Sequence, residues 1–185
     1  EIGAKTISVE PVPVAYKYLK ENVYVNNLNG LVETFNICLG STTGRIKFTK
    51  SLDTVNHVAL GNELDIIEVP VKRLDDVLGG KSPILLKVDV EGYELEVLRG
   101  ANKTLSNLNL KALIVELNGS GSKYGFKDID VHNDLISRGF LPYSYNPFNR
   151  EILKLDTYGK NNTIYLRDEK LVSDRLTNSR KIRIN

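Results

Sequence analysis

The chain has 185 residues, of which 41% are apolar and 26% charged, and its net charge is +2. This length allows one domain with a real core, and the small net charge argues against nucleic acid as a partner. No apolar run approaches the ~20 residues that span a bilayer, and no signal-peptide pattern opens the chain. The single cysteine suits a reducing compartment. We therefore expect a cytoplasmic protein with no membrane partner.

Short strands alternate with helices in the first half, as apolar periodicity and turn residues indicate. The expected elements are a strand over 5–10, a helix over 14–27, strands over 31–37, 45–49 and 65–71, and a helix over 73–78 that is stopped by the pair Gly79-Gly80. The first of these strands ends in an acid, Glu10.

The segment 82–101 predicts a buried strand, a tight acidic turn and a helix that ends at Gly100. Its apolar run at 84–88 is typical of a parallel strand covered on both faces. Asp89 ends the strand, and Glu91 and Gly92 form the turn. Ligands of open α/β sheets bind at the carboxyl ends of strands, so Asp89 and Glu91 lie where chemistry is usually done.

The later half predicts a second buried strand over 111–117, followed by a flexible loop over 118–125 and a helix over 129–137. The strands at 140–145 and 163–167 are joined without an obvious helix, which indicates an antiparallel hairpin at one edge. The expected fold is an α/β sheet that is mostly parallel. We expect one domain over 1–167 and a polar, partly disordered tail over 168–185.

Several polar residues are candidates for binding or chemistry. Glu10 can accept two hydrogen bonds from a ribose diol, although a solvated acid in a loop would look the same. Asp89 and Glu91 can raise one another's pKa, or share a metal or a substrate hydroxyl; alternatively, one of them caps the helix. Glu116 and Asn118, at the end of the next strand, are candidates for lining the same crevice or for a polar rim.

Two further residues have one candidate role each. His57 could serve as a general base near neutral pH, although a lone histidine is more often a surface residue. Cys38 is expected to be a small buried hydrophobe that borders a ligand ring without reacting. With two histidines and one cysteine we predict no zinc site, and the spacing of the acids demands no other metal.

The run Lys87-Val-Asp-Val-Glu-Gly-Tyr-Glu94, followed by Val-Leu-Arg-Gly-Ala at 97–101, resembles the FkbM-type methyltransferase family. So do Ile-Ser-Val-Glu-Pro-Val-Pro at 7–13, Asn-Ile-Cys-Leu-Gly at 36–40, and Asn-Thr-Ile-Tyr-Leu-Arg-Asp at 162–168. The likeness covers nearly the whole chain. It implies a Rossmann-like class I sheet and an enzyme that uses S-adenosylmethionine to methylate an oxygen, often a sugar or polyketide hydroxyl.

The resemblance also implies roles for individual residues. Glu10, with Pro11 beside it, would bind the cofactor ribose, and Cys38 and Leu39 would border the adenine. Asp89 would lie beside the sulfonium and the acceptor. His57, Asp89 or Glu91 would take the hydroxyl proton as the methyl group arrives.

The chain departs from the family pattern in two places. Gly40 is followed by Ser41 where the family often has Asp, which removes one polar contact near the adenine. The family's first strand and glycine-rich loop are absent from the sequence, so we expect an additional unit before Glu1, with its strand between those ending at Glu10 and Asp89. Without that strand, two strand edges would be unpaired.

Two other functions compete with this one. A non-catalytic relative could keep the fold as an interaction or scaffolding domain without binding the cofactor. A nucleotide-binding oxidoreductase would explain Glu10 but not the acidic turn. The expected partner is a small-molecule or glycan acceptor, and the oligomeric state stays open, with a homodimer as one option.

Overall fold

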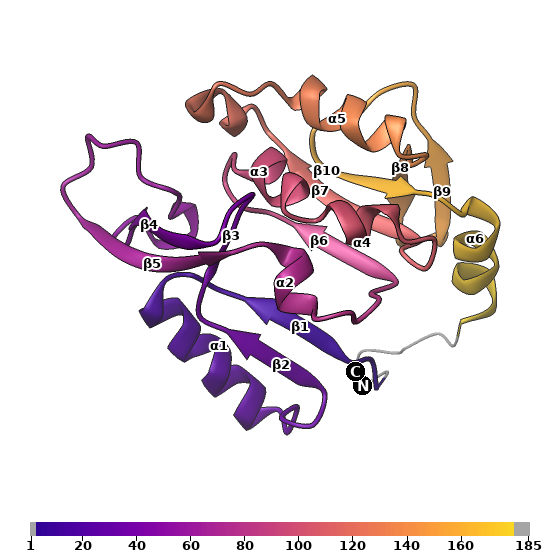
Figure 1. Cartoon of the computed structure of the whole chain (residues 1–185). Helices are drawn as coiled ribbons and strands as arrows, with labels where there is room; N and C mark the ends of the chain where they lie inside the picture. The colour runs from indigo at the N-terminus through magenta and orange to yellow at the C-terminus, as the bar shows by residue number, and fades with distance from the viewer. Residues whose placement is uncertain (1–2, 180–185) are drawn as a thin grey trace. The chain divides into compact units, whose positions relative to one another are not determined.

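The computed structural model describes residues 3–179, whose helices and strands fall into two compact units (Figure 1). The first unit contains the residues up to Gly80 together with Glu96–Ala101. The second contains Lys81–Leu95 and the residues from Asn102 onward. Among the described helices, none combines the length and the apolar character needed to cross a membrane.

The first unit begins with a parallel strand pair, β1 (Thr6–Val9) and β2 (Val32–Phe35), joined through helix α1 (Pro13–Val25). Proline at the first helical position has no N–H to leave unpaired, which favours the helix start there. The Tyr16 hydroxyl lies 3.1 Å from Thr34 Oγ1 and so ties the helix to β2. This unit places Glu10 directly after β1.

A three-stranded sheet of order β3-β5-β4 completes the strands of the first unit. Its members are β3 (Cys38–Leu39), β4 (Gly44–Thr49) and β5 (Ile66–Lys72), with a 3-10 turn at Asp53–Val55 and helix α2 (Leu74–Leu78) after β5. Helix α2 ends at Gly79, which has a φ of +54°. This confirms the stop predicted at the glycine pair.

The second unit contains a five-stranded sheet of order β6-β7-β10-β8-β9. Its strands are β6 (Leu85–Val88), β7 (Ala112–Leu117), β8 (Leu141–Asn146), β9 (Glu151–Lys154) and β10 (Asn161–Leu166). Its helical segments are α4 (Asn102–Ser106), a 3-10 turn at Ser120–Tyr124, α5 (Asp128–Ser137) and α6 (Glu169–Asn178). Helix α3 (Glu94–Arg99) starts in this unit and continues in the first.

One face of this sheet is buried at its central strands. Leu113 and Val115 of β7 and Tyr165 of β10 have no exposed surface. His132 of α5 contacts the same face, because its Nδ1 lies 3.0 Å from the Tyr165 hydroxyl. Just past β10, the Arg167 guanidinium donates hydrogen bonds to four backbone carbonyls and stacks on Phe140, which anchors the end of the last strand.

Three fold predictions are wrong in part. The sheets are mixed rather than mostly parallel: among residues 3–179, three strand pairs are parallel and four antiparallel. Strand β10 lies between β7 and β8, so the edge hairpin is β8–β9, and β9 was not predicted. Residues 169–178 form helix α6, whose first turn is capped by Asp168, which accepts a hydrogen bond from the Leu171 N–H at 3.1 Å; residues 180–185 lie outside the described part.

Strand β6 is less buried than its sequence suggests. Leu85 is 50% exposed and Ile84 just before it is 45% exposed, because within residues 3–179 β6 pairs only with β7. In the same residues β1 pairs only with β2. Each of these strands therefore has one unpaired edge in the described chain. The additional strand expected before Glu1 stays a prediction.

Candidate functional site

In the first unit, the Glu10 side chain is held by its own turn. Glu10 Oε1 accepts a hydrogen bond from the Val12 N–H at 2.7 Å. The Asn36 amide donates to the backbone carbonyls of Glu10 and Pro11 at 2.8 and 3.0 Å. The turn that follows β1 is therefore fixed at both ends, and it presents a half-buried carboxylate.

The surroundings of Glu10 are largely apolar. Burial raises the pKa of Glu10, and the bond from Val12 partly opposes this. Cys38 is 5% exposed, and burial together with the charge of Glu10 raises the pKa of its thiol to about 12. The thiol therefore stays protonated, which confirms the prediction of a small buried hydrophobe and shows that Cys38 lies near Glu10. Leu39 and Pro11, the other two predicted cofactor contacts, are half-buried.

In the second unit, three predicted site residues come together: Asp89, Glu91 and Glu116, here called the carboxylate cluster. One carboxylate oxygen of each lies within 4.8 Å of those of the other two. The strand register explains the approach of Asp89 to Glu116, because Val88 pairs with Val115 and these two acids are the next residues along their strands. The spacing would suit a divalent cation, but exposed acids adopt it without one as well.

The turn that displays Asp89 and Glu91 is tightly constrained. Glu91 has a φ of +54° and Gly92 a φ of +102°. A Cβ at Gly92 would lie 2.4 Å from the Ser120 carbonyl oxygen, so only glycine allows the turn to approach that backbone. The Tyr93 and Tyr124 rings pack edge to face at 5.1 Å beside this contact.

The pKa values of two acids in the carboxylate cluster are shifted in opposite directions. Burial raises the pKa of Glu116 to about 7, assisted by its hydrogen bond with Asp89 and by the charges of Asp89 and Glu91. Burial opposes ionisation of Asp89 too, but the bonds from Lys87 and Glu116 lower its pKa below the ordinary value. Lys87 Nζ lies 2.5 Å from Asp89 Oδ2. Near neutral pH, Glu116 is therefore only partly ionised, whereas Asp89 is the more acidic of the two.

Asn118 lies outside this cluster. It is exposed, and its Oδ1 accepts a hydrogen bond from the Ser120 N–H at 3.0 Å. This contact starts the 3-10 turn that replaces the flexible loop expected at 118–125. Its assignment as a substrate contact stays a prediction.

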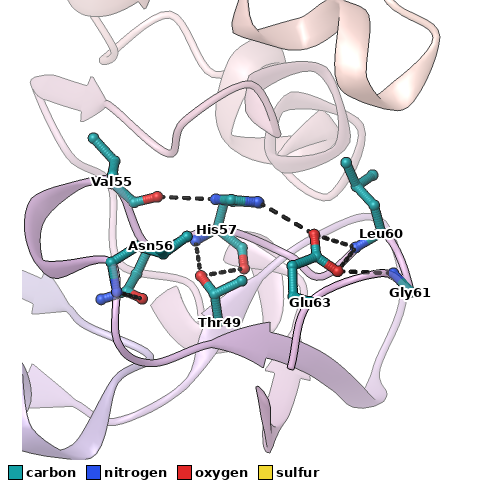
Figure 2. Close-up of polar contacts among 8 residues, drawn as sticks. Thr49, Val55, Asn56, His57, Leu60, Gly61 and Glu63 are labelled. Carbon is teal, nitrogen blue, oxygen red and sulfur yellow. Dashed lines mark hydrogen bonds and ion pairs between the residues drawn. The ribbon is translucent and has the colours of Figure 1, made fainter. Parts of the chain in front are cut away.

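His57 belongs to the first unit, in the segment between β4 and β5 (Figure 2). Its Nδ1 lies 2.9 Å from the Val55 carbonyl oxygen and its Nε2 lies 3.5 Å from Glu63 Oε1. The Glu63 carboxylate in turn accepts bonds from the N–H groups of Leu60 and Gly61 (Figure 2). Both ring nitrogens thus face acceptors, an arrangement that stabilises the segment; the role of general base stays a prediction.

Sequence reasoning missed two residues that shape the cluster. Lys87 is two residues before Asp89 on the same strand face, a spacing that period-two alternation could have revealed. Glu94 accepts hydrogen bonds at its Oε1 from the N–H groups of Val90 and Gly92, at 3.2 and 3.1 Å. The pattern Glu-Gly-x-Glu at the start of a helix was its signal.

Several known proteins are similar to this chain. Hexuronic acid methyltransferase AglP of Haloferax volcanii is 31% identical over 151 residues, which are 80% of this chain and 59% of that protein. Methyltransferase 1 of Beauveria bassiana is 31% identical over 136 residues, 60% of this chain and 54% of the relative. The chain spans about half the length of these curated relatives.

A solved structure and a family model also match this chain. The crystal structure of methyltransferase FkbM from Methylobacillus flagellatus superposes with a TM-score of 0.56 over 88% of this chain and 36% of that chain, at 16% identity. This likeness shows a shared α/β fold. The model of the methyltransferase FkbM domain matches residues 1–162, and the chain therefore belongs to the FkbM methyltransferase family.

Proposed function

We propose that the protein is an S-adenosylmethionine-dependent O-methyltransferase that acts on a hydroxyl of a sugar, glycan or related small molecule, on a Rossmann-like sheet. Family membership supports methyl transfer, and the relative from Haloferax volcanii, a hexuronic acid methyltransferase, supports a sugar acceptor. The parallel pairs β1–β2 and β6–β7, each with an acid after or at a strand end, are compatible with this type of sheet.

The observation that carries the proposal is the geometry at Glu10. A ribose diol needs an acceptor with two free lone-pair directions next to an apolar wall for the base. The carboxylate at the end of β1 meets this need. The Val12 N–H binds Oε1 only, and Asn36 fixes the turn that holds the carboxylate. The neighbouring Cys38 is buried and uncharged and so provides an apolar surface. Glu10 would hold the ribose hydroxyls, and Cys38 and Leu39 would border the adenine.

When bound, S-adenosylmethionine supplies an electrophilic methyl group. The acceptor hydroxyl oxygen would form the new bond to the methyl carbon as the carbon–sulfur bond breaks and S-adenosylhomocysteine leaves. Its proton would pass to Asp89, which is ionised because the bonds from Lys87 and Glu116 lower its pKa. A weak base suffices here, because the hydroxyl proton becomes strongly acidic as the oxygen–carbon bond forms. Glu116, whose pKa is raised to about 7, can in its protonated form donate a hydrogen bond to Asp89 or to the acceptor. Orienting the hydroxyl supplies much of the rate, since the reaction needs little more than alignment with the methyl group.

The test uses the full-length gene product, S-adenosylmethionine with an isotopically labelled methyl group, and a panel of uronic acid and neutral sugar glycosides. Asp89→Asn is expected to lower the transfer rate at saturating cofactor by roughly 10²–10⁴-fold. The exposed Glu151→Gln on β9 serves as the control. An Asp89→Asn enzyme with the full rate would contradict the role of Asp89, and a protein that binds no cofactor would point to an interaction domain.

A further inference from the structure

Glu94 is a buried carboxylate outside the residues assigned so far. It is 5% exposed, at the first position of α3. A buried carboxylate costs several kcal/mol unless hydrogen bonds compensate it, so such a group usually has a defined task. Two backbone N–H groups, of Val90 and Gly92, donate to its Oε1.

These two donors lie on either side of Glu91 in sequence. The residue between them has a left-handed φ of +54°, which an L-residue adopts only when its surroundings enforce it. Glu94 Oε1 thus binds the N–H groups of the residues on both sides of Glu91. Without this link, the backbone at 90–92 would be held only by the bond from the Tyr93 N–H to the Val90 carbonyl, at 3.3 Å, and by the packing of Gly92 against Ser120.

We propose that Glu94 is the positioning residue of the carboxylate cluster: its side chain fixes the turn at 90–92 and thereby holds Asp89 and Glu91 beside Glu116. Glu94 touches neither acceptor nor cofactor in this account. The inference concerns the geometry of the cluster and stands whether or not the proposed methyl transfer is correct.

The charge of Glu94 and the length of its side chain act on the carboxylate cluster in separate ways. The charges that act on Glu116 are those of Asp89, Glu91 and Glu94, and Lys87 pairs with Asp89. Asp128 is the charged neighbour that acts on Glu94 itself. Removing the charge of Glu94 therefore weakens one repulsion on Glu116, whereas shortening the side chain removes the two bonds to the turn.

Two substitutions separate these contributions. Glu94→Gln keeps the length and one acceptor oxygen but removes the charge. Glu94→Asp keeps the charge but is one methylene too short to reach both N–H groups. Asp130→Asn is the matched control, because Asp130 also accepts a hydrogen bond from a backbone N–H at a helix start, that of Lys127, without belonging to the cluster.

The experiment is a pH titration of the side-chain carboxyl carbons by NMR, on the 185-residue chain without cofactor or acceptor. In Glu94→Gln we expect the Glu116 midpoint to stay raised, within about half a pH unit of wild type. In Glu94→Asp we expect it to fall toward the ordinary glutamate value of about 4.3, because Asp89 and Glu91 move away. Asp130→Asn should leave the midpoint unchanged.

The proposal is overturned if Glu94→Asp keeps the wild-type midpoint, or if both Glu94 variants shift it equally. Near-UV circular dichroism establishes that each variant is folded. If Glu94→Asp does not fold, Glu94→Gln still tests the proposal, since an ordinary midpoint in that variant contradicts it. Because no cofactor is present, failure here is distinct from failure of the proposed function.

Discussion

The Glu10 turn and the carboxylate cluster place acids at strand ends in two different ways. Glu10 has one backbone donor to an oxygen and an uncharged neighbour in Cys38. The cluster instead brings three carboxylates within 4.8 Å and adds the charge of Glu94. The first arrangement leaves a carboxylate that can accept hydroxyl hydrogens, and the second raises the pKa of one acid, Glu116, to about 7.

This difference shows that neighbouring groups, rather than residue type, determine what a carboxyl group can do. Burial raises the pKa of both Glu10 and Glu116, but only Glu116 has like charges beside it. Lys87, paired with Asp89, then lowers the pKa of Asp89 while that of Glu116 is raised, so the two acids ionise over different pH ranges. Single substitutions in the two regions test this difference.

The largest effect is expected for Gly92→Ala. The new Cβ would overlap the Ser120 carbonyl, and the φ of +102° disfavours any side chain. We expect the free energy of unfolding, measured by urea denaturation, to fall by about 2–4 kcal/mol, with loss of the raised Glu116 titration.

Gly125→Ala is the matched control for this prediction. Gly125 also has a positive φ, of +78°, but a Cβ there meets no atom within 4 Å. It should cost about 1–2 kcal/mol from backbone conformation alone and leave the cluster intact. Equal losses in the two variants would show that the close approach to Ser120 is unimportant.

A smaller effect is expected for Glu116→Gln. Since the folded pKa of Glu116 is about 7 and the unfolded value about 4.3, the folded state holds a proton that the unfolded state releases between these pH values. Wild-type stability therefore falls as pH rises through this window. Glutamine removes that contribution, so the variant should be more stable at pH 8 by about 1 kcal/mol, allowing for solvent screening.

Thermal unfolding at pH 4.5 and pH 8 measures this change, with a gain of roughly 2–4 °C expected at pH 8. The raised pKa values of Glu10 and Glu94 have the same sign, so some slope should persist in the variant. Identical pH dependence in wild type and variant would show that Glu116 ionises normally.

The smallest effect is expected for His57→Gln. The substitution removes the contacts with Val55 and Glu63 and should cost about 1 kcal/mol or less, seen as a small drop in melting temperature. Methyl transfer and its pH dependence should be unchanged within a few-fold. A rate loss of roughly 10²-fold or more would instead support the predicted role of His57 as a base.

Much of the local structure could be predicted from the sequence. Apolar periodicity located α1, β4, β5 and β7 to within a few residues, and Gly79 and Gly92 marked real backbone reversals. The polar helix α6 was missed because none of its residues is buried, so its sequence carries no strong apolar stripe. Strand β9 was missed because four residues at an edge leave too short a pattern.

The site was predictable to a different degree in each unit. The strand-end rule located Asp89, Glu91 and Glu116, and the register of β6 with β7 brings them together. Sequence could not assign the proton to Glu116, because that depends on Lys87 and on burial in three dimensions. Sequence reasoning also did not select Glu94. Its hydrogen bonds to the residues two and four positions earlier depend on the shape of the turn, which only the structure shows.

Calorimetric titration of S-adenosylmethionine into the full-length gene product measures whether Glu10 binds the cofactor. Glu10→Gln should weaken binding by about 1.5–3 kcal/mol, roughly 10- to 150-fold, because a charged hydrogen-bonding group is lost. Glu21→Gln, an exposed acid on α1, should bind as wild type does. Equal affinity of wild type and Glu10→Gln would contradict the assignment of Glu10 to the cofactor.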